Sequence, residues 1–419
     1  MDELLWIWLS SLKVDAQKKL RLLRHFKSIE RLYEADAEAY MSTGLIKGSS
    51  LKHLTDKSLD TAEKIMEKCL AAGVRMLAID DGDYPERLAN IDDAPVVLYY
   101  KGTLPSFDSE PVIAVVGSRN STVYGHMAAE RLSYEMSVCG GHIVSGLAKG
   151  IDAAAHSGAL LAGRPTTAVL GCGPDIIYPK ENRRLYEEIS VRGCILSEYP
   201  PGTPPLRHHF PERNRIVSGL SVGVVVIEAG LMSGALITAR LAADQGRDVF
   251  AVPGNIDVPE SAGSNSLIQS GAKLVMQGWD VLTEYEGLFP DKLYKSINGN
   301  NYAYTKTAGS KMPDRPQTVF AEIGTANDEN IRTVTDPLNK TGANNLDYNQ
   351  KSLEYLRKDF TELQMRIILS LAKRPMHLDQ IIEECDLTAA KALAELTILE
   401  IKGAVTQLPG KWFSVSRTI

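Results

Sequence analysis

The chain has 419 residues, of which 44% are hydrophobic and 23% are charged, a composition typical of a soluble globular protein with two or three domains. Its net charge of −6 excludes a nucleic-acid binder that acts through its whole surface, so any anion site has to be a local basic patch. The 5 cysteines are dispersed and include no C-x-x-C pair, which argues against a disulfide framework and against a zinc site.

The first residues contain a short apolar run, residues 4–9. This run is too short to span a membrane, and it follows Asp2 and Glu3 rather than a basic stretch. We therefore expect no membrane segment and no signal peptide, and we expect a cytoplasmic protein.

Residues 1–72 have the pattern of several short helices. Apolar residues recur there at helical spacing, at Leu20, Leu23, Phe26 and Leu32, and again at Ile65, Cys69 and Leu70. The turn at residues 43–48 is similar to the hairpin of a helix-hairpin-helix module, whose backbone amides face a phosphate. A small helical docking domain is the alternative. The sequence predicts an N-terminal helical domain of the SAM or helix-hairpin-helix type.

Residues 73–289 alternate between strand and helix, which is the pattern of a parallel sheet with helices on both faces. The predicted strands are residues 112–116, 142–144, 167–170, 194–196, 222–227, 249–252 and 273–276. The predicted helices between them include residues 124–139, 151–161 and 234–244. Residues 74–100 are expected to add an edge strand at 96–100 or a small cap. The fold class is therefore α/β, with a parallel sheet as its core; the family resemblance described below implies that this core is extended and Rossmann-like.

Residues 290–355 change character, because Asn, Thr, Lys and Gly dominate and no apolar period survives. We interpret them as a flexible linker. Residues 356–419 regain helical periodicity and end in a hairpin-like segment at 404–413, the outline of a C-terminal winged helix. Its expected recognition helix, residues 388–401, offers Lys391 but also Glu395 and Glu400, so protein docking is at least as well supported as DNA reading.

A basic segment at residues 207–215 stands out against the acidic whole. Arg207, Arg213 and Arg215 gather there with one aromatic residue, Phe210, just before a strand. Arginine supplies forked donors for phosphate, and an aromatic face stacks on any unpaired base. The alternative is a solvated loop whose arginines pair with Glu198 and Glu212.

Small and polar turns follow the predicted strands. They hold Gly117, Ser118 and Arg119, then Ser145, Gly146 and Lys149, and later Ser233 and Gly234. Parallel strands bring such turns to one edge of the sheet, where glycines and helix N-termini accept anions. Each turn alone is weak evidence, and their convergence predicts one basic groove.

Enzyme motifs are absent from this edge. The chain has no G-x-G-x-x-G after the first strand, no P-loop and no H-E-x-x-H, so we expect no nucleotide cofactor and no metal. His156 lies among alanines and is expected to be a packed histidine, while His208 and His209 have no assignable carboxylate or nucleophile partner.

Long strings of the chain resemble the DNA-processing protein A family (DprA, also called Smf). They lie at residues 116–119, 145–156, 178–182, 197–200, 210–221, 233–239 and 252–254, and the winged helix extends the match. The order and length of these strings make the resemblance specific. It covers about half of the chain, from residue 84 to residue 275, and the Asn-rich linker is atypical of the family.

The resemblance implies a Rossmann-like domain that dimerises, binds single-stranded DNA and delivers it to the RecA recombinase, notably in natural transformation. It implies phosphate contacts from Gly117, Ser118 and Arg119, and a phosphate contact and base stacking from Arg207 and Phe210. Matching motifs also contain Ser145, Gly146, Lys149, Arg213, Asn214, Ser233 and Gly234. Duplex DNA is expected to bind more weakly.

An enzyme is the competing hypothesis. The fold also resembles nucleotide phosphoribohydrolases, whose mark is a P-G-G-x-G-T-x-x-E turn. Where that motif has its catalytic carboxylate, this chain offers Leu236, Ile237 or Thr238. Without the carboxylate an oxocarbenium-like transition state has no stabilising group, so we expect binding and no catalysis.

Overall fold

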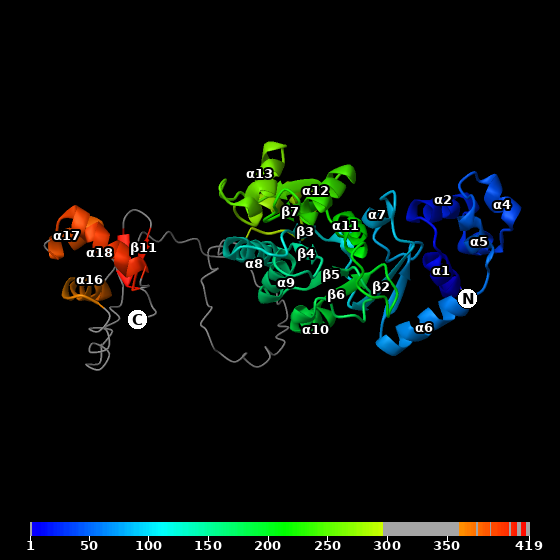
Figure 1. Ribbon diagram of the computed structural model, residues 1–419, viewed down its shortest axis with the longest axis horizontal. Coiled ribbons are helices and arrows are strands. Elements are labelled where there is room, and N and C mark those ends of the chain that lie inside the picture. The colour runs from blue at the N-terminus through cyan, green and yellow to red at the C-terminus, as the bar shows by residue number, and fades with distance from the viewer. Residues whose placement is uncertain are drawn as a thin grey trace, which may run out of the picture. The chain divides into compact units, whose positions relative to one another are not determined.

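The computed structural model describes residues 2–295, 360–373, 376–385, 387–401, 404–408 and 412–415 (Figure 1). They fall into two compact units, one up to residue 295 and one from residue 360. The linker expected at 290–355 lies mainly outside the described residues. Its first residues belong to the α/β unit, because Leu293 is buried and the amide of Tyr294 donates to the carbonyl of Cys139 at 3.2 Å.

The first unit is built around a nine-stranded sheet in the order β1-β2-β6-β5-β4-β3-β7-β8-β9. The strands are β1 (Arg75–Ala78), β2 (Val97–Gly102), β3 (Val112–Val116), β4 (His142–Ser145), β5 (Thr166–Leu170), β6 (Cys194–Ser197), β7 (Gly223–Val226), β8 (Asp248–Ala251) and β9 (Lys273–Leu274). Strands β6, β5, β4, β3, β7, β8 and β9 run parallel to one another. Strand β2 pairs antiparallel with β6, and β1 pairs antiparallel with β2. The predicted α/β class with a mostly parallel sheet is confirmed.

The strand expected at the edge of the sheet is not an edge strand. The strand expected at the edge is β2, and it pairs with β6 on one side and with β1 on the other. The edge belongs to β1, which the sequence pattern did not reveal because its 4 residues include an exposed arginine and a half-buried methionine.

Helices cover both faces of the sheet, as Figure 1 shows. They are α7 (Glu86–Ala89), α8 (Val123–Val138), α9 (Ile151–Leu161), α10 (Arg183–Arg192), α11 (His209–Leu220), α12 (Gly234–Asp244), α13 (Ala262–Gln269) and α14 (Trp279–Leu282). Side chains alternate along each strand, so Ala114 and Val116 of β3 share a core with α11 and α12. Ile113 and Val115 share the other core with α8 and α9.

The order of the strands creates a crevice at the carboxyl end of β3. The chain moves outward from β3 through β4 and β5 to β6, and α11 then brings it back to place β7 on the other side of β3. The connections that follow β3 and β7 therefore leave the sheet in opposite directions. In open parallel sheets ligands bind at this switch point.

Six helices precede the sheet: α1 (Asp2–Ser11), α2 (Ala16–Phe26), α3 (Ile29–Glu34), α4 (Ala37–Ser42), α5 (Ser49–Thr55) and α6 (Asp60–Ala72). The apolar run of α1 is buried, and its Trp6 and Trp8 belong to the same hydrophobic cluster as Tyr99 of β2. Lys19 of α2 is buried and donates to the carbonyl of Ser10 at 2.6 Å. Across the described ranges, no helix has the length and hydropathy needed to cross a membrane.

The second unit contains α16 (Glu362–Lys373), β10 (Met376–His377), α17 (Leu378–Glu384), α18 (Ala389–Ile401), β11 (Val405–Leu408) and β12 (Trp412–Val415). Its three strands pair in the order β10-β12-β11. Buried residues from all three helices and from the hairpin, among them Ile368, Ile381, Leu396 and Phe413, form one core. The predicted winged helix is confirmed.

Two histidines of the α/β unit are fully buried. Nε2 of His142 lies 2.9 Å from the hydroxyl of Thr167, and its Nδ1 lies 3.5 Å from the carboxylate of Glu110. Nδ1 of His156 lies 2.8 Å from the hydroxyl of Thr166. The Thr166 hydroxyl donates to the carbonyl of Ile143, so it accepts from His156, whose other ring nitrogen has no partner. Burial lowers the pKa of His142 to about 4 and that of His156 to about 3. Both rings are therefore neutral in the folded protein.

These histidines predict a loss of stability in mild acid. In the unfolded chain His142 and His156 are protonated as the pH falls below their ordinary pKa of 6.5. In the folded protein they are not protonated until the pH reaches about 4 and about 3. Stability should be full above pH 6.5 and fall as the pH drops toward 4. Urea unfolding at about pH 7 and about pH 5 measures this fall. The variant His156→Gln should show a smaller fall; the same fall in both proteins would contradict the assignment.

Candidate functional site

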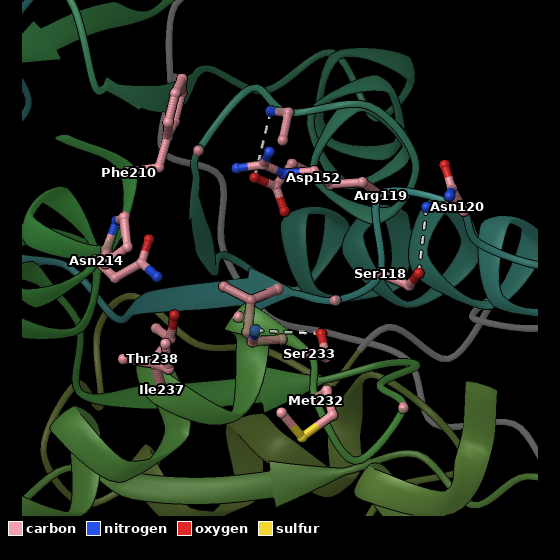
Figure 2. Close-up of a pocket in the computed structure, with 18 of the residues that line it drawn as sticks. Ser118, Arg119, Asn120, Asp152, Phe210, Asn214, Met232, Ser233, Ile237 and Thr238 are labelled. Carbon is pink, nitrogen blue, oxygen red and sulfur yellow. Dashed lines mark hydrogen bonds between the residues drawn. The ribbon is translucent and has the colours of Figure 1, made fainter. Parts of the chain in front are cut away.

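A cavity of about 770 Å³ opens at the switch point between β3 and β7. Three segments surround it: the turn after β3, the start of α11 and the β7–α12 connection. Figure 2 shows Phe210 and Asn214 on one side, Ser118, Arg119 and Asn120 opposite, and Met232 and Ser233 below. The convergence of polar turns that the sequence predicts at this edge is thus the wall of a single cavity.

The turn after β3 is held by the strand beside it. The amide of Ser118 donates to the carbonyl of Glu228 at 2.7 Å, and the amide of Asn120 donates to the hydroxyl of Ser118 at 3.2 Å. A Cβ on Gly117 would overlap Ile151, so glycine is required for this approach. The turn projects the exposed side chain of Arg119, whose guanidinium lies 5.0 Å from the centre of the Phe210 ring. Arg119 forms no salt bridge within the described ranges, although its charge acts on the buried carboxylate of Asp152, whose pKa burial raises and this charge lowers.

The carboxylate of Glu228 also occupies the N-terminus of α8, the helix that follows the first parallel strand and that binds a phosphate in many Rossmann folds. This buried carboxylate accepts the backbone amide of Thr122 at 2.8 Å and the hydroxyl of Thr122 at 2.7 Å, at the N-terminus of α8. A Cβ on Gly125 would overlap the same carboxylate. The positive end of α8 therefore holds an anion of the protein itself, and a ligand anion is directed to the cavity on the other side.

Helix α11 presents one face to the cavity and buries another. Phe210, Asn214 and Val217 line the cavity, because residues spaced by three or four positions share a helix face. Arg215 is buried, pairing with Glu198 at 2.6 Å and with Asp93 at 3.4 Å. The basic segment is thus neither wholly a groove nor a solvated loop: Arg215 does pair with Glu198, as in the alternative, but inside the protein.

Arg213 lies beneath the cavity and is 4% exposed. It donates to the carbonyl of Val169, and a Cβ on Gly146 would overlap its guanidinium. Asp152 is buried nearby and accepts the amide of Ala148 at 3.3 Å. Burial raises the pKa of Asp152 above its ordinary value, and the guanidinium of Arg213 opposes that rise. Arg213 thus anchors α11, and its charge lies opposite that of Asp152 in the floor of the cavity.

The loop before α12 forms the third wall. The hydroxyl of Ser233 accepts the amide of Ala235 at 3.3 Å, and Gly234 is the first residue of the helix. Leu231 and Met232, in the same loop, are 65% and 99% exposed. This wall therefore combines a capped helix start with an apolar lip.

Nine of the predicted site residues line the cavity: Gly117, Ser118, Arg119, Gly146, Phe210, Arg213, Asn214, Ser233 and Gly234. Ser145 is fully buried and donates to the carbonyl of Val115 at 2.6 Å, so it supports the sheet. Lys149 is exposed outside the lining and pairs with Glu181 at 2.5 Å. Arg207 is exposed and also lies outside the lining.

Several lining residues were not predicted, among them Asn120, Asp152 and Met232. Asn120 directly follows the Gly-Ser-Arg turn, and Asp152 lies within a string that carries the resemblance, so the sequence held a signal for both. Met232 has none, because the exposure of an apolar side chain is a tertiary property. No group of three or more metal-ligating side chains gathers anywhere in the described part of the chain.

Comparison with known proteins gives the same picture for both units. The family model of DNA recombination-mediator protein A matches residues 75–286, and that of the DprA winged helix domain matches residues 358–411. The protein Smf of Synechocystis is 35% identical over 398 residues, which are 93% of this chain and 92% of that protein. DNA processing protein DprA of Streptococcus pneumoniae is 51% identical over 211 residues, 50% of this chain and 73% of that protein.

The fold has a solved counterpart. The X-ray structure of DNA processing protein A from Streptococcus pneumoniae aligns with a TM-score of 0.59 and 40% sequence identity. The alignment covers 67% of this chain and 95% of that one.

The contact between Gly146 and Arg213 predicts an asymmetry between two glycines of the cavity. Gly146→Ala should lower the free energy of unfolding by ~1 to 3 kcal/mol, because a Cβ there displaces a buried guanidinium. Gly234→Ala, with no atom within 4 Å of the added Cβ, should stay within about 0.5 kcal/mol of the wild type. Urea unfolding followed by tryptophan fluorescence measures both, and equal stabilities would contradict the tight fit.

Proposed function

The chain belongs to the family of DNA recombination-mediator protein A, and from that premise we propose that it binds single-stranded DNA in the cavity between β3 and β7. The observation that carries the proposal is the pairing of Arg119 with Phe210. An exposed guanidinium that forms no salt bridge in the described residues lies 5.0 Å from the centre of a partly exposed aromatic ring at the mouth of a cavity. These are the two groups that an unpaired nucleotide needs, one for its phosphate and one for its base.

The cavity favours a single strand over a duplex. In a duplex the bases are already stacked and paired, so they cannot reach a ring set beside a recessed cavity. Asn214, Ser118 and Ser233 add neutral polar groups at the walls, and the floor carries the opposed charges of the buried Arg213 and Asp152. We propose that three exposed cations bind phosphates of the DNA: Arg119 at the mouth of the cavity, and Lys149 and Arg207 outside it.

We also propose that the bound strand is delivered to the RecA recombinase, notably in natural transformation, by a homodimer in the cytoplasm. This part is supported by the resemblance in sequence to the DNA-processing protein A family. Light scattering tests the dimer, and assembly of RecA on protein-coated single strands tests the delivery.

The alternative, a nucleotide-hydrolysing enzyme, has weaker support from the site. Of the positions where the phosphoribohydrolase motif has its carboxylate, Ile237 and Thr238 line the cavity and Leu236 packs into the core. The buried carboxylate in the cavity belongs to Asp152, which accepts the Ala148 amide and lies near Arg213. The other carboxylate of the lining, Glu260, lies just before α13 and not at a position of that motif.

The binding proposal predicts a modest salt dependence for oligo-dT. With three phosphates neutralised by exposed cations, log affinity should fall with log salt at a slope of about −2. Arg119→Ala should flatten the slope by about 0.7, whereas Phe210→Ala should cost ~1 to 3 kcal/mol and leave the slope unchanged. Fluorescence anisotropy across a salt series measures both. Arg183→Ala, an exposed arginine on α10 paired with Glu187, serves as the control.

A salt-independent affinity, or equal affinity for a matched duplex, would overturn the binding proposal. A loss with Arg183→Ala as large as that with Arg119→Ala would indicate non-specific attraction instead of a site.

The binding proposal also predicts no turnover of nucleotides. Incubation with nucleoside 5′-monophosphates should release no free base, as measured by reversed-phase chromatography, because none of the motif positions 236–238 carries a carboxylate to stabilise an oxocarbenium-like transition state. Base release that disappears in Asp152→Asn would establish the enzyme alternative.

A further inference from the structure

We propose that Tyr178, in the loop after β5, is a second base-stacking residue that extends the DNA track beyond the cavity. The inference rests on the proposed binding of single-stranded DNA and adds a subsite to it. Its occupant is the unpaired base next to the one on Phe210.

The geometry joins the two rings into one aromatic surface. The ring centre of Tyr178 lies 5.5 Å from that of Phe210, with an angle of 39° between the planes. The Tyr178 side chain is exposed, at 40%, whereas the Phe210 side chain is half-buried. Within the described residues the Tyr178 hydroxyl has no hydrogen-bond partner. The ring is therefore open to a ligand on its solvent side, and its hydroxyl holds no structural contact in the protein.

The surroundings of Phe210 show why a second ring is useful. The guanidinium of Arg119 lies over the Phe210 ring, and a Cβ on Gly171 would come within 3.1 Å of the ring edge. These neighbours limit the aromatic surface that Phe210 itself can offer to bases. A neighbouring base in a single strand needs its own face to stack on.

The other aromatic rings nearby are committed to the protein. Tyr199 and His209 stack on each other with their centres 3.9 Å apart, and the Tyr199 hydroxyl donates to Glu212 at 2.8 Å. His209 is buried as well. His208 is exposed too, but its ring packs edge-on against His209, with the centres 4.5 Å apart. Tyr178 is the exposed ring that contacts Phe210.

The loop that carries Tyr178 is fixed before any ligand arrives. The side-chain Nδ2 of Asn182 donates to the carbonyl of Leu147 at 2.9 Å, and Glu181 pairs with Lys149 at 2.5 Å, so the loop is tied to the one after β4. Two cations accompany the ring, because Lys149 and Lys180 are exposed on these loops. β4 lies between β3 and β5 in the sheet. A single-stranded DNA that leaves the cavity past Phe210 would therefore reach Tyr178 by crossing the loop after β4.

The competing explanation is that Tyr178 merely covers one side of Phe210. A cover would support Phe210 for every ligand, and its loss would weaken the binding of short and long oligonucleotides alike. A second stacking residue acts only on oligonucleotides long enough to reach it. Oligonucleotide length therefore separates the two roles.

The test uses the full-length chain with Tyr178→Leu, Tyr178→Phe and, as a control, Tyr294→Leu. Tyr294 is 52% exposed and contacts the C-terminal end of α8, away from the edge where the cavity lies. Fluorescence anisotropy gives the affinity for oligo-dT of increasing length, starting from the shortest that wild type binds. We expect Tyr178→Leu to lose about tenfold or more on long oligonucleotides, with the shortest one and the salt slope unaffected.

Tyr178→Phe should stay within about twofold of wild type, because the ring is what stacks, and Tyr294→Leu should bind normally. Wild-type affinity of Tyr178→Leu at every length, or an equal loss at every length, would overturn this inference and leave the binding proposal intact. A wild-type protein that shows no preference for single strands would overturn both.

Discussion

The placing of α11 by two buried arginines is the constraint on which the candidate site depends. Arg213 holds the helix against β5 through the carbonyl of Val169, and Arg215 holds it to Glu198 and Asp93. A buried guanidinium is costly when its donors lose their partners, so breaking these contacts by rotating or sliding the helix would be unfavourable. Phe210 and Asn214 face the cavity because the arginines of the same helix face elsewhere.

This arrangement also explains how an acidic protein can present an anion site. The net charge of −6 is spread over the chain, while the cavity has Arg213 beneath it and Arg119 at its mouth. The carboxylate of Glu228 caps α8, and its backbone carbonyl braces the turn after β3. Two other carboxylates, Asp152 and Glu260, belong to the lining of the cavity. The exposed cation at the mouth is Arg119, and the rings of Phe210 and Tyr178 lie beside it.

Strand positions were readable from sequence because buried parallel strands are nearly continuous apolar runs. The strand predicted at 112–116 coincides with β3, and the helix predicted at 151–161 coincides with α9. β1 was missed because a short edge strand lacks such a run. Residues 290–295 were assigned to the linker because their composition is polar, although Leu293 packs into the core. The expected helix-hairpin-helix or SAM character of the N-terminal helices stays a prediction.

The sequence by itself determined the fold class, the edge at which the polar turns meet and the segments that could touch a ligand, because each follows from local periodicity and from strand order. Tertiary structure decided which side chains within those segments are free. Arg119 and Arg213 belong to equally suggestive motifs, yet one is exposed over an aromatic ring and the other is buried beneath the cavity. Ser145 and Ser233 differ in the same way. Local sequence fixes neither outcome, because exposure depends on contacts with β5, β7 and the loops between them, all distant along the chain.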